Sequence, residues 1–136
     1  MSMNIKIKIE SKVSNLRIVE NAIDEATNEM GISQDNYGKI LVSTLEAVNN
    51  AILHGNQSNP DKIVEVEIVF KGNEIKIIVT DEGLGFRPDE VPDPTVAENI
   101  EALNGRGVYL ISRLADKIKY SKKGNTVTMI FKNILT

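Results

Sequence analysis

A column of polar side chains in the segment TLEAVNNAILHGN, residues 44–56, is the first feature that could support chemistry. Glu46, Asn50 and His54 recur every four residues, so a helix would stack them in one narrow column. Asparagine offers a neutral oxygen ligand, which Mg²⁺ accepts beside phosphate oxygens and water. A glutamate one turn earlier could take a proton from an attacking hydroxyl. The column alone also fits a solvent-facing helix stripe, and His54 beside Gly55 also fits a cation at the negative helix end.

Two glycine-containing segments could allow close backbone approach to a ligand. TDEGLGF places Asp81 after a strand-like run and before Gly83 and Gly85. NGRGVYLI places Gly105 and Gly107 at an expected helix start, where N–H groups and the helix dipole suit phosphate. Asp81 is a hydrogen-bond acceptor, and adenine offers an exocyclic amino group as donor. Taken alone, the first segment also fits an ordinary turn and the second a loop-to-helix junction.

The sequence excludes several common ligand sites. A dinucleotide fingerprint would need a third glycine where Pro88 stands, and the Gly-Lys-Ser/Thr run of a Walker loop is absent. The chain has no cysteine and one histidine, which excludes a disulfide framework, a Cys/His zinc site and a thiol nucleophile. The net charge is −3 with both signs interspersed, so there is no basic surface for nucleic acid.

One compact domain over residues 1–136 is expected to position these segments. Periodicity predicts a strand in MNIKIKIE, helices over 13–30 and from Ser33 or Asp35 to Gly55, strands over 64–70 and 74–80, a helix in GRGVYLISRLA and a hairpin in KIKYSKKGNTVTMIFKNI. The second helix has an apolar stripe through Leu41, Leu45, Val48 and Ile52. Because hairpins impose antiparallel pairing, we expect an α+β, two-layer sandwich with a mixed, mostly antiparallel sheet and helices on one face.

The chain is expected to be a soluble cytoplasmic protein. Its start, MSMNIKIKIESK, lacks the apolar core of a signal peptide, and no apolar run is long enough to cross a bilayer. The absence of cysteine fits a reducing compartment. We therefore expect no direct contact with a membrane.

The order of the three segments resembles the GHKL, or Bergerat-fold, ATPase superfamily. E-x-x-x-N in a helix, D-x-G-x-G-F after a strand, and G-R-G before a helix resemble its N, G1 and G2 boxes. Within this superfamily, EAVNNAILHGN and VPDPTVAENIEALNGRGVYLI look like the bacterial anti-sigma-factor serine/threonine kinases. The resemblance spans essentially the whole chain and implies the Bergerat ATP-binding fold.

The resemblance implies roles for residues of the first two boxes. Asn50 would ligate Mg²⁺, and Glu46 would be the candidate general base. Asp81 would bind the amino group of adenine, with Gly83 and Gly85 shaping that pocket.

The resemblance also implies roles for the later part of the chain. Gly105, Arg106 and Gly107 would lie against the phosphates of ATP, and residues 87–104 would form the ATP lid. Thr128 on the last hairpin would support the adenine end.

Two features depart from the superfamily pattern. Tyr109 stands where some members have a further glycine. An H-box helix pair is absent, and the single histidine lies beside the N box, which argues against a complete histidine kinase.

The resemblance implies a kinase that transfers the γ-phosphoryl group of ATP to a serine or threonine of an anti-anti-sigma (STAS) antagonist. The kinase would sequester a sigma factor in a partner switch. One alternative is a module in which nucleotide sets the lid and a partner is sequestered without transfer. Another is an interaction domain that binds no nucleotide. A homodimer is also implied, and the alternating first strand could pair along a sheet edge.

Overall fold

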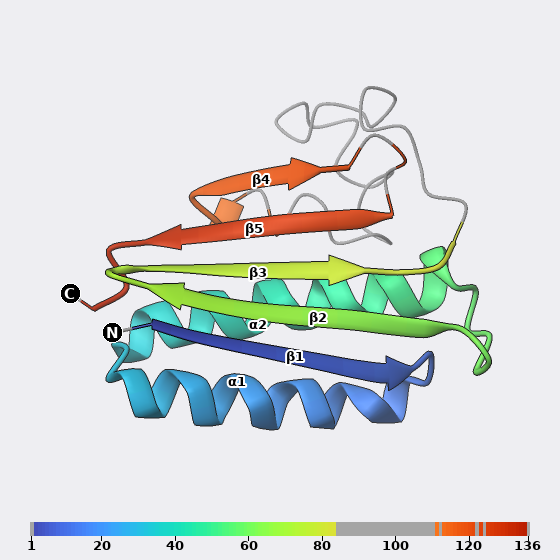
Figure 1. Ribbon diagram of the computed structural model, residues 1–136, viewed down its shortest axis with the longest axis horizontal. Coiled ribbons are helices and arrows are strands. Elements are labelled where there is room, and N and C mark those ends of the chain that lie inside the picture. Colours follow the sequence, from blue (N-terminus) through green and yellow to red (C-terminus); the bar gives the residue numbers. More distant parts are fainter. Residues whose placement is uncertain (1, 84–110, 112, 122, 124, 136) are drawn as a thin grey trace.

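The computed structural model describes residues 2–83, 111, 113–121, 123 and 125–135 (Figure 1). Its elements, in chain order, are β1 (Ser2–Glu10), a 3₁₀ turn η1 (Val13–Asn15), α1 (Leu16–Met30), α2 (Gln34–Asn50), a π-helical turn η2 (Ala51–Gly55), β2 (Ile63–Lys71), β3 (Glu74–Thr80), β4 (Lys117–Tyr120) and β5 (Thr126–Lys132). The backbone at Ile111, Arg113 and Leu114 is helical, which agrees with the end of the helix predicted there.

The five strands form one sheet in the order β1-β2-β3-β5-β4. Each neighbouring pair is antiparallel, so the described strands contain no parallel pair. The two predicted hairpins are the pairs β2 with β3 and β4 with β5, and they join where β5 lies against β3. The predicted α+β fold is therefore confirmed.

Helices α1 and α2 cover one side of the sheet (Figure 1). Alternate residues of the strands point to this side, and β2 buries Val64, Val66, Ile68 and Phe70 there. The alternation predicted from MNIKIKIE is confirmed, because Ile9 pairs with Val64 and both are buried. The core therefore lies between the sheet and the two helices.

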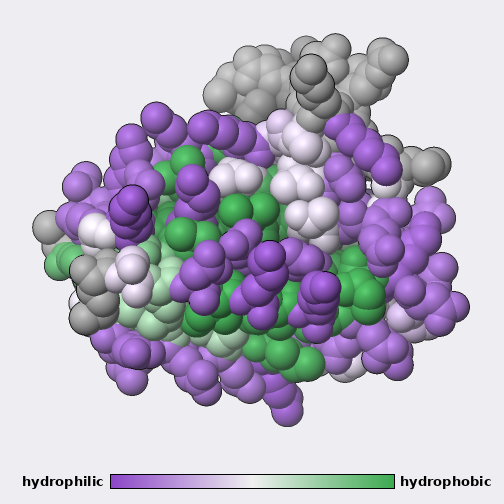
Figure 2. Space-filling model, in the orientation of Figure 1, coloured by the Kyte–Doolittle hydropathy of each residue, from purple (hydrophilic) through white to green (hydrophobic). Residues whose placement is uncertain are grey.

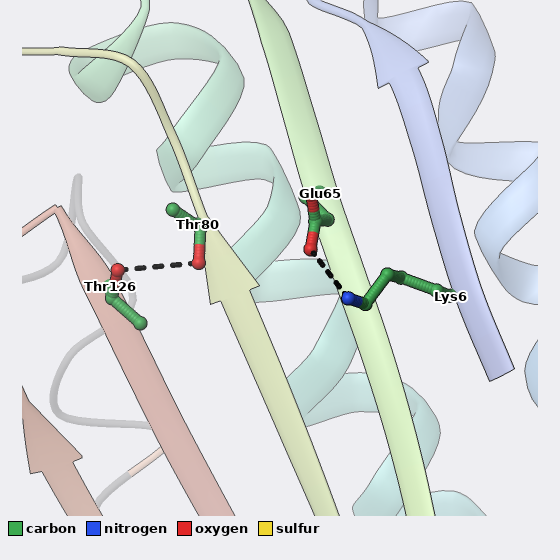
Figure 3. Close-up of polar contacts among 4 residues, drawn as sticks. All are labelled: Lys6, Glu65, Thr80 and Thr126. Atoms are coloured by element: carbon green, nitrogen blue, oxygen red, sulfur yellow. Dashed lines mark hydrogen bonds and ion pairs between the residues drawn. The ribbon is translucent and has the colours of Figure 1, made fainter. Parts of the chain in front are cut away.

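The other side of the sheet faces away from α1 and α2, and we call it the open side. Figure 2 shows apolar and hydrophilic surface intermixed in this view. Lys6 Nζ lies 3.8 Å from Glu65 Oε1 across neighbouring strands, and Thr126 Oγ1 donates to Thr80 Oγ1 at 3.2 Å (Figure 3). The open side thus carries cross-strand polar pairs of the kind that stabilise a solvated sheet face.

Helix α1 is shorter than the sequence predicts, because residues 13–15 form the 3₁₀ turn η1. Its end is as predicted. Gly31 adopts a left-handed conformation with φ of 70° and caps the helix, a conformation that glycine reaches without steric cost.

Helix α2 begins as predicted, with Ser33 as its N-cap; the Asn36 backbone N–H donates to Ser33 Oγ at 3.4 Å. The α-helix does not run to Gly55, however. It ends at Asn50 and continues as the π-helical turn η2. None of the helices in the described part of the chain is long and apolar enough to cross a membrane.

The buried face of α2 is rotated from the predicted apolar stripe. Val48 and Ile52 are fully buried as predicted, but Leu41 and Leu45 are only half-buried. Thr44 occupies the core instead, where its hydroxyl donates to the Ile40 carbonyl at 2.7 Å. Because this bond satisfies the hydroxyl, Thr44 can lie in the core, although the hydrophobic pattern predicted its neighbour Leu45 there.

Candidate functional site

Glu46 and Asn50 lie one turn apart on α2, and both side chains are half-buried. The backbone is α-helical through Asn50, so their side chains share a face of the helix as predicted. His54 lies in η2 and is exposed. The Asn56 backbone N–H donates to the Ala51 carbonyl at 2.8 Å, a five-residue step that ends the regular α-helical column before His54.

Asp81 directly follows β3, where the sheet gives way to a turn. Its backbone N–H donates to the Asn125 carbonyl at 2.9 Å, and Asn125 Nδ2 donates to the Asp81 carbonyl at 3.0 Å. The Gly83 N–H donates to Asp81 Oδ1 at 2.8 Å. These contacts fix both the backbone and the carboxylate of Asp81. A carboxylate has about four acceptor positions, so this geometry is compatible with a further donor such as an amino group.

Gly55 and Gly83 bring the end of η2 against this turn. A Cβ added at Gly55 would lie 2.3 Å from Asp81 Oδ2, and a Cβ added at Gly83 would lie 2.0 Å from the Gly55 carbonyl oxygen. Both distances are far inside van der Waals contact, so any side chain at either position would displace its neighbour. The segment that carries Glu46 and Asn50 is therefore packed directly against the segment that carries Asp81.

Asn56 joins the same two segments and was missed by the sequence analysis. It is fully buried, and its Oδ1 accepts from the Glu82 backbone N–H at 2.7 Å. Its Nδ2 donates to Ser11 Oγ at 2.8 Å and to the Ile63 carbonyl at 3.1 Å. The one available signal was an asparagine directly after the helix-ending glycine, because asparagine suits such positions through side-chain bonds to backbone.

Thr128 is not brought to this group of residues. It pairs with Ile78 on β3 and with Lys119 on β4, one position out of step with the core residues Met129 and Val79. Because strand side chains alternate, Thr128 lies on the open side of the sheet. Among the described residues of this hairpin, Asn125 contacts Asp81.

The remaining predicted site residues lie outside the described residues. These are Gly85, Gly105, Arg106 and Gly107, together with the predicted lid over 87–104 and the departure at Tyr109.

The donor set of the described residues suits a magnesium ion that is held mainly by its substrate. Within those residues, no three His, Cys, Asp or Glu side chains are grouped so that they could hold a metal ion by themselves. Mg²⁺ at nucleotide sites commonly uses one or two protein oxygens plus phosphates and water rather than a protein cage. The amide oxygen of Asn50 on α2 fits that limited protein contribution.

The sequence is similar to known anti-sigma factors along nearly its whole length. Residues 9–131 match the histidine kinase-like ATPase domain family. An anti-sigma F factor of Oceanobacillus iheyensis is 27% identical over 134 residues, covering 95% of this chain and 92% of that protein. Another from Clostridium kluyveri is 26% identical over 134 residues, with coverage of 96% and 94%. One from Bacillus cytotoxicus is 34% identical over 84 residues, which cover 60% of this chain and 56% of that protein.

The fold is similar to the crystal structure of the RsbU and RsbW domains of Rv1364c from Mycobacterium tuberculosis. The TM-score is 0.64 at 17% sequence identity, over 96% of this chain and 32% of that chain. At this identity the likeness bears on the fold alone, and it agrees with the Bergerat-type sandwich predicted from the motifs.

Proposed function

Because the chain belongs to the histidine kinase-like ATPase family, we propose that it is an anti-sigma factor that uses ATP to phosphorylate a serine or threonine of an anti-anti-sigma antagonist. The contact of Gly55 with Asp81 and Gly83 carries this proposal, because it joins the predicted metal-binding helix to the predicted adenine-binding turn. The anti-sigma F factors that align along nearly the whole chain support the choice of partner class.

Asp81 would accept a hydrogen bond from the amino group of adenine. The Gly83 N–H holds this carboxylate, and the two hydrogen bonds between Asn125 and the Asp81 backbone hold the residue that carries it, so little reorganisation is needed when the base binds. Gly85 would shape the same pocket. Thr128, on the open side, would act on the adenine end only through strand β5.

The phosphate end of the site would be formed by α2 and the glycine-rich segment. Asn50 would contribute an oxygen to Mg²⁺, and bound Mg²⁺ supplies charge neutralisation on the transferring phosphoryl group. Gly105, Arg106 and Gly107 would contact the phosphates, because a helix start offers N–H groups to anions.

Glu46 would act as general base, one helical turn before Asn50. Its carboxylate would take the proton of the antagonist hydroxyl while the hydroxyl oxygen bonds to the γ-phosphorus and ADP leaves. The products are the phosphorylated antagonist and ADP.

Unphosphorylated antagonist would compete with the sigma factor for this protein, and its phosphorylation would return the sigma factor to the sequestered state. Because sigma factors act on cytoplasmic transcription, we place the protein in the cytoplasm.

Transfer can be tested with the purified chain, a purified STAS-domain antagonist from the same genome, Mg²⁺ and γ-labelled ATP. The proposal predicts label on one serine or threonine of the antagonist, with ADP formed in equal amount. A stable complex with the antagonist in which ATP is never consumed would contradict transfer and favour a binding module that uses nucleotide only as a switch.

We also propose a homodimer that pairs through β1. This strand is at one end of the strand order, and it is bonded along its length to β2 on one side. Its alternating isoleucines and lysines suit pairing with a second copy, although lysines at an edge also protect against aggregation. Light scattering at micromolar concentration should give the dimer mass, and a monomer mass would contradict this proposal.

A further inference from the structure

Asn56 bridges three segments that are distant in sequence. Its Oδ1 accepts from the Glu82 N–H at 2.7 Å, and its Nδ2 donates to Ser11 Oγ and to the Ile63 carbonyl. Its side chain is fully buried, and these bonds use both of its amide protons and its oxygen. Asn56 therefore links the end of η2, the segment after β1 and the start of β2 to the turn that follows Asp81.

The bond to Glu82 is one of two anchors that flank Asp81. On the side of β5, Asn125 exchanges two hydrogen bonds with the Asp81 backbone, at 2.9 and 3.0 Å. On the other side, Asn56 holds the N–H of the next residue, Glu82. The following N–H, from Gly83, donates to the Asp81 carboxylate. The orientation of that carboxylate thus depends on a turn whose middle residue is held by Asn56.

We propose that Asn56 is a positioning residue that sets the preference of this site for adenine over guanine nucleotides. This inference rests on the proposed role of Asp81 as the acceptor for the adenine amino group. Adenine presents an amino donor at the position where guanine presents a carbonyl acceptor. A fixed carboxylate therefore accepts from adenine and repels guanine, whereas a carboxylate free to turn away discriminates less.

Asn56→Ala is the direct test of this role, and Ser11→Ala and Asn56→Asp are the controls that separate it from a purely structural one. Ser11→Ala removes one partner of Asn56 Nδ2, and also the Ser11 bond to the Lys62 carbonyl at 2.7 Å, but leaves the bond to Glu82 in place. Asn56→Asp keeps an acceptor for the Glu82 N–H and loses the amide donors. Asn56→Ala loses both functions. All three substitutions disturb a buried polar network, but only the last removes the Glu82 anchor.

The experiment is calorimetric titration of the wild type and the three variants with ATP and with GTP, each with Mg²⁺, well below every melting midpoint. We expect the ratio of ATP to GTP affinity to fall at least about tenfold in Asn56→Ala, the scale of one well-placed hydrogen bond. We expect Ser11→Ala and Asn56→Asp to keep the wild-type ratio within about twofold, whatever their loss of thermal stability.

Three results would overturn the inference. The first is an unchanged ratio in Asn56→Ala, and the second is an equal fall in Ser11→Ala, which would mark a general loss of structure. The third is a fall of about tenfold in the ratio of ATP to GTP affinity in Asn56→Asp, because this variant keeps the acceptor for the Glu82 N–H. That result would overturn the inference even if the alanine variant does not fold. A wild type that binds no adenine nucleotide would instead contradict the proposed function itself, so the two failures are distinguishable.

Discussion

The α-carbon of Gly55 faces the carboxylate of Asp81 so closely that an added Cβ would lie 2.3 Å from Oδ2. Gly55 ends the π-helical turn after α2, and Asp81 follows β3. The two residues belong to different motifs, 26 positions apart in the sequence, and each limits where the other can lie. The position of the carboxylate proposed to bind adenine is thus set partly by the end of the helix that carries Glu46 and Asn50.

Gly55→Ala is expected to push the Asp81 carboxylate out of position. The methyl group would overlap both carboxylate oxygens, the second at 2.8 Å, so the turn after β3 must shift. We expect ATP affinity to fall at least about tenfold and the free energy of unfolding to fall by about 1–3 kcal/mol, as overpacking usually costs. Titration calorimetry and urea unfolding measure the two effects.

Gly38→Ala is the matched control for that substitution. Gly38 lies inside α2, and a Cβ added there meets no atom within 4 Å. Alanine at a helix-interior position stabilises by about 0.5–1 kcal/mol relative to glycine. We expect this gain with unchanged ATP affinity. Wild-type affinity in Gly55→Ala would show that the Gly55 contact does not position Asp81. An equal loss in Gly38→Ala would show that the effect of Gly55→Ala is not specific to that contact.

Glu46→Gln is expected to abolish phosphoryl transfer while ATP binding is retained. Glutamine keeps the size of the side chain on α2 but cannot accept the proton of the antagonist hydroxyl at neutral pH. A loss of about 10²-fold or more in the transfer rate fits the removal of a general base. Single-turnover assays with labelled ATP measure the rate. Unchanged phosphorylation of the antagonist would remove Glu46 from the base role.

Tyr37 is expected to make folding stability sensitive to alkaline pH. Its hydroxyl donates to Asp24 Oδ1, and this bond, followed by desolvation and the charges of Asp24 and Glu20, raises the pKa of Tyr37 above its usual value of 10.0. Because the folded-state pKa lies above the unfolded value, the contribution is present below about pH 10 and is lost as pH rises through the folded-state pKa.

Tyr37→Phe separates this effect from that of Tyr120, whose pKa burial also raises. We expect the variant to lose at most about 1 kcal/mol at neutral pH, because the Tyr37–Asp24 pair is partly exposed. The difference in unfolding free energy between wild type and variant should shrink as pH rises above about 10. A difference that stays constant through the alkaline range would contradict the assigned bond.

Local patterns were sufficient to predict most of the fold. The alternation of isoleucines and lysines from Ile5 to Ile9 predicted β1, and these isoleucines pair with apolar residues of β2. The left-handed cap at Gly31 and the N-cap at Ser33 were also predictable, because both depend on residues close in sequence.

The details of the site were less predictable because they depend on contacts between distant segments. The π-helical turn was missed, since a hydrophobic period does not distinguish it from one more α-helical turn. Asn56 was missed because two of its three partners, Ser11 and Glu82, lie 45 and 26 positions away in the sequence. Gly55 was recognised as a helix end, but its contact with Asp81 required the folded chain.

The proposed binding of adenine by Asp81, in a site proposed to take Mg²⁺ and phosphate as well, is tested most directly by calorimetric titration with ATP. The wild type and Asp81→Asn would each be titrated with and without Mg²⁺. We predict metal-dependent binding that the substitution weakens by more than about 1.4 kcal/mol, tenfold in affinity, because asparagine would present a donor to the amino group. Absence of binding by the wild type, or equal affinity in Asp81→Asn, would contradict the proposed site.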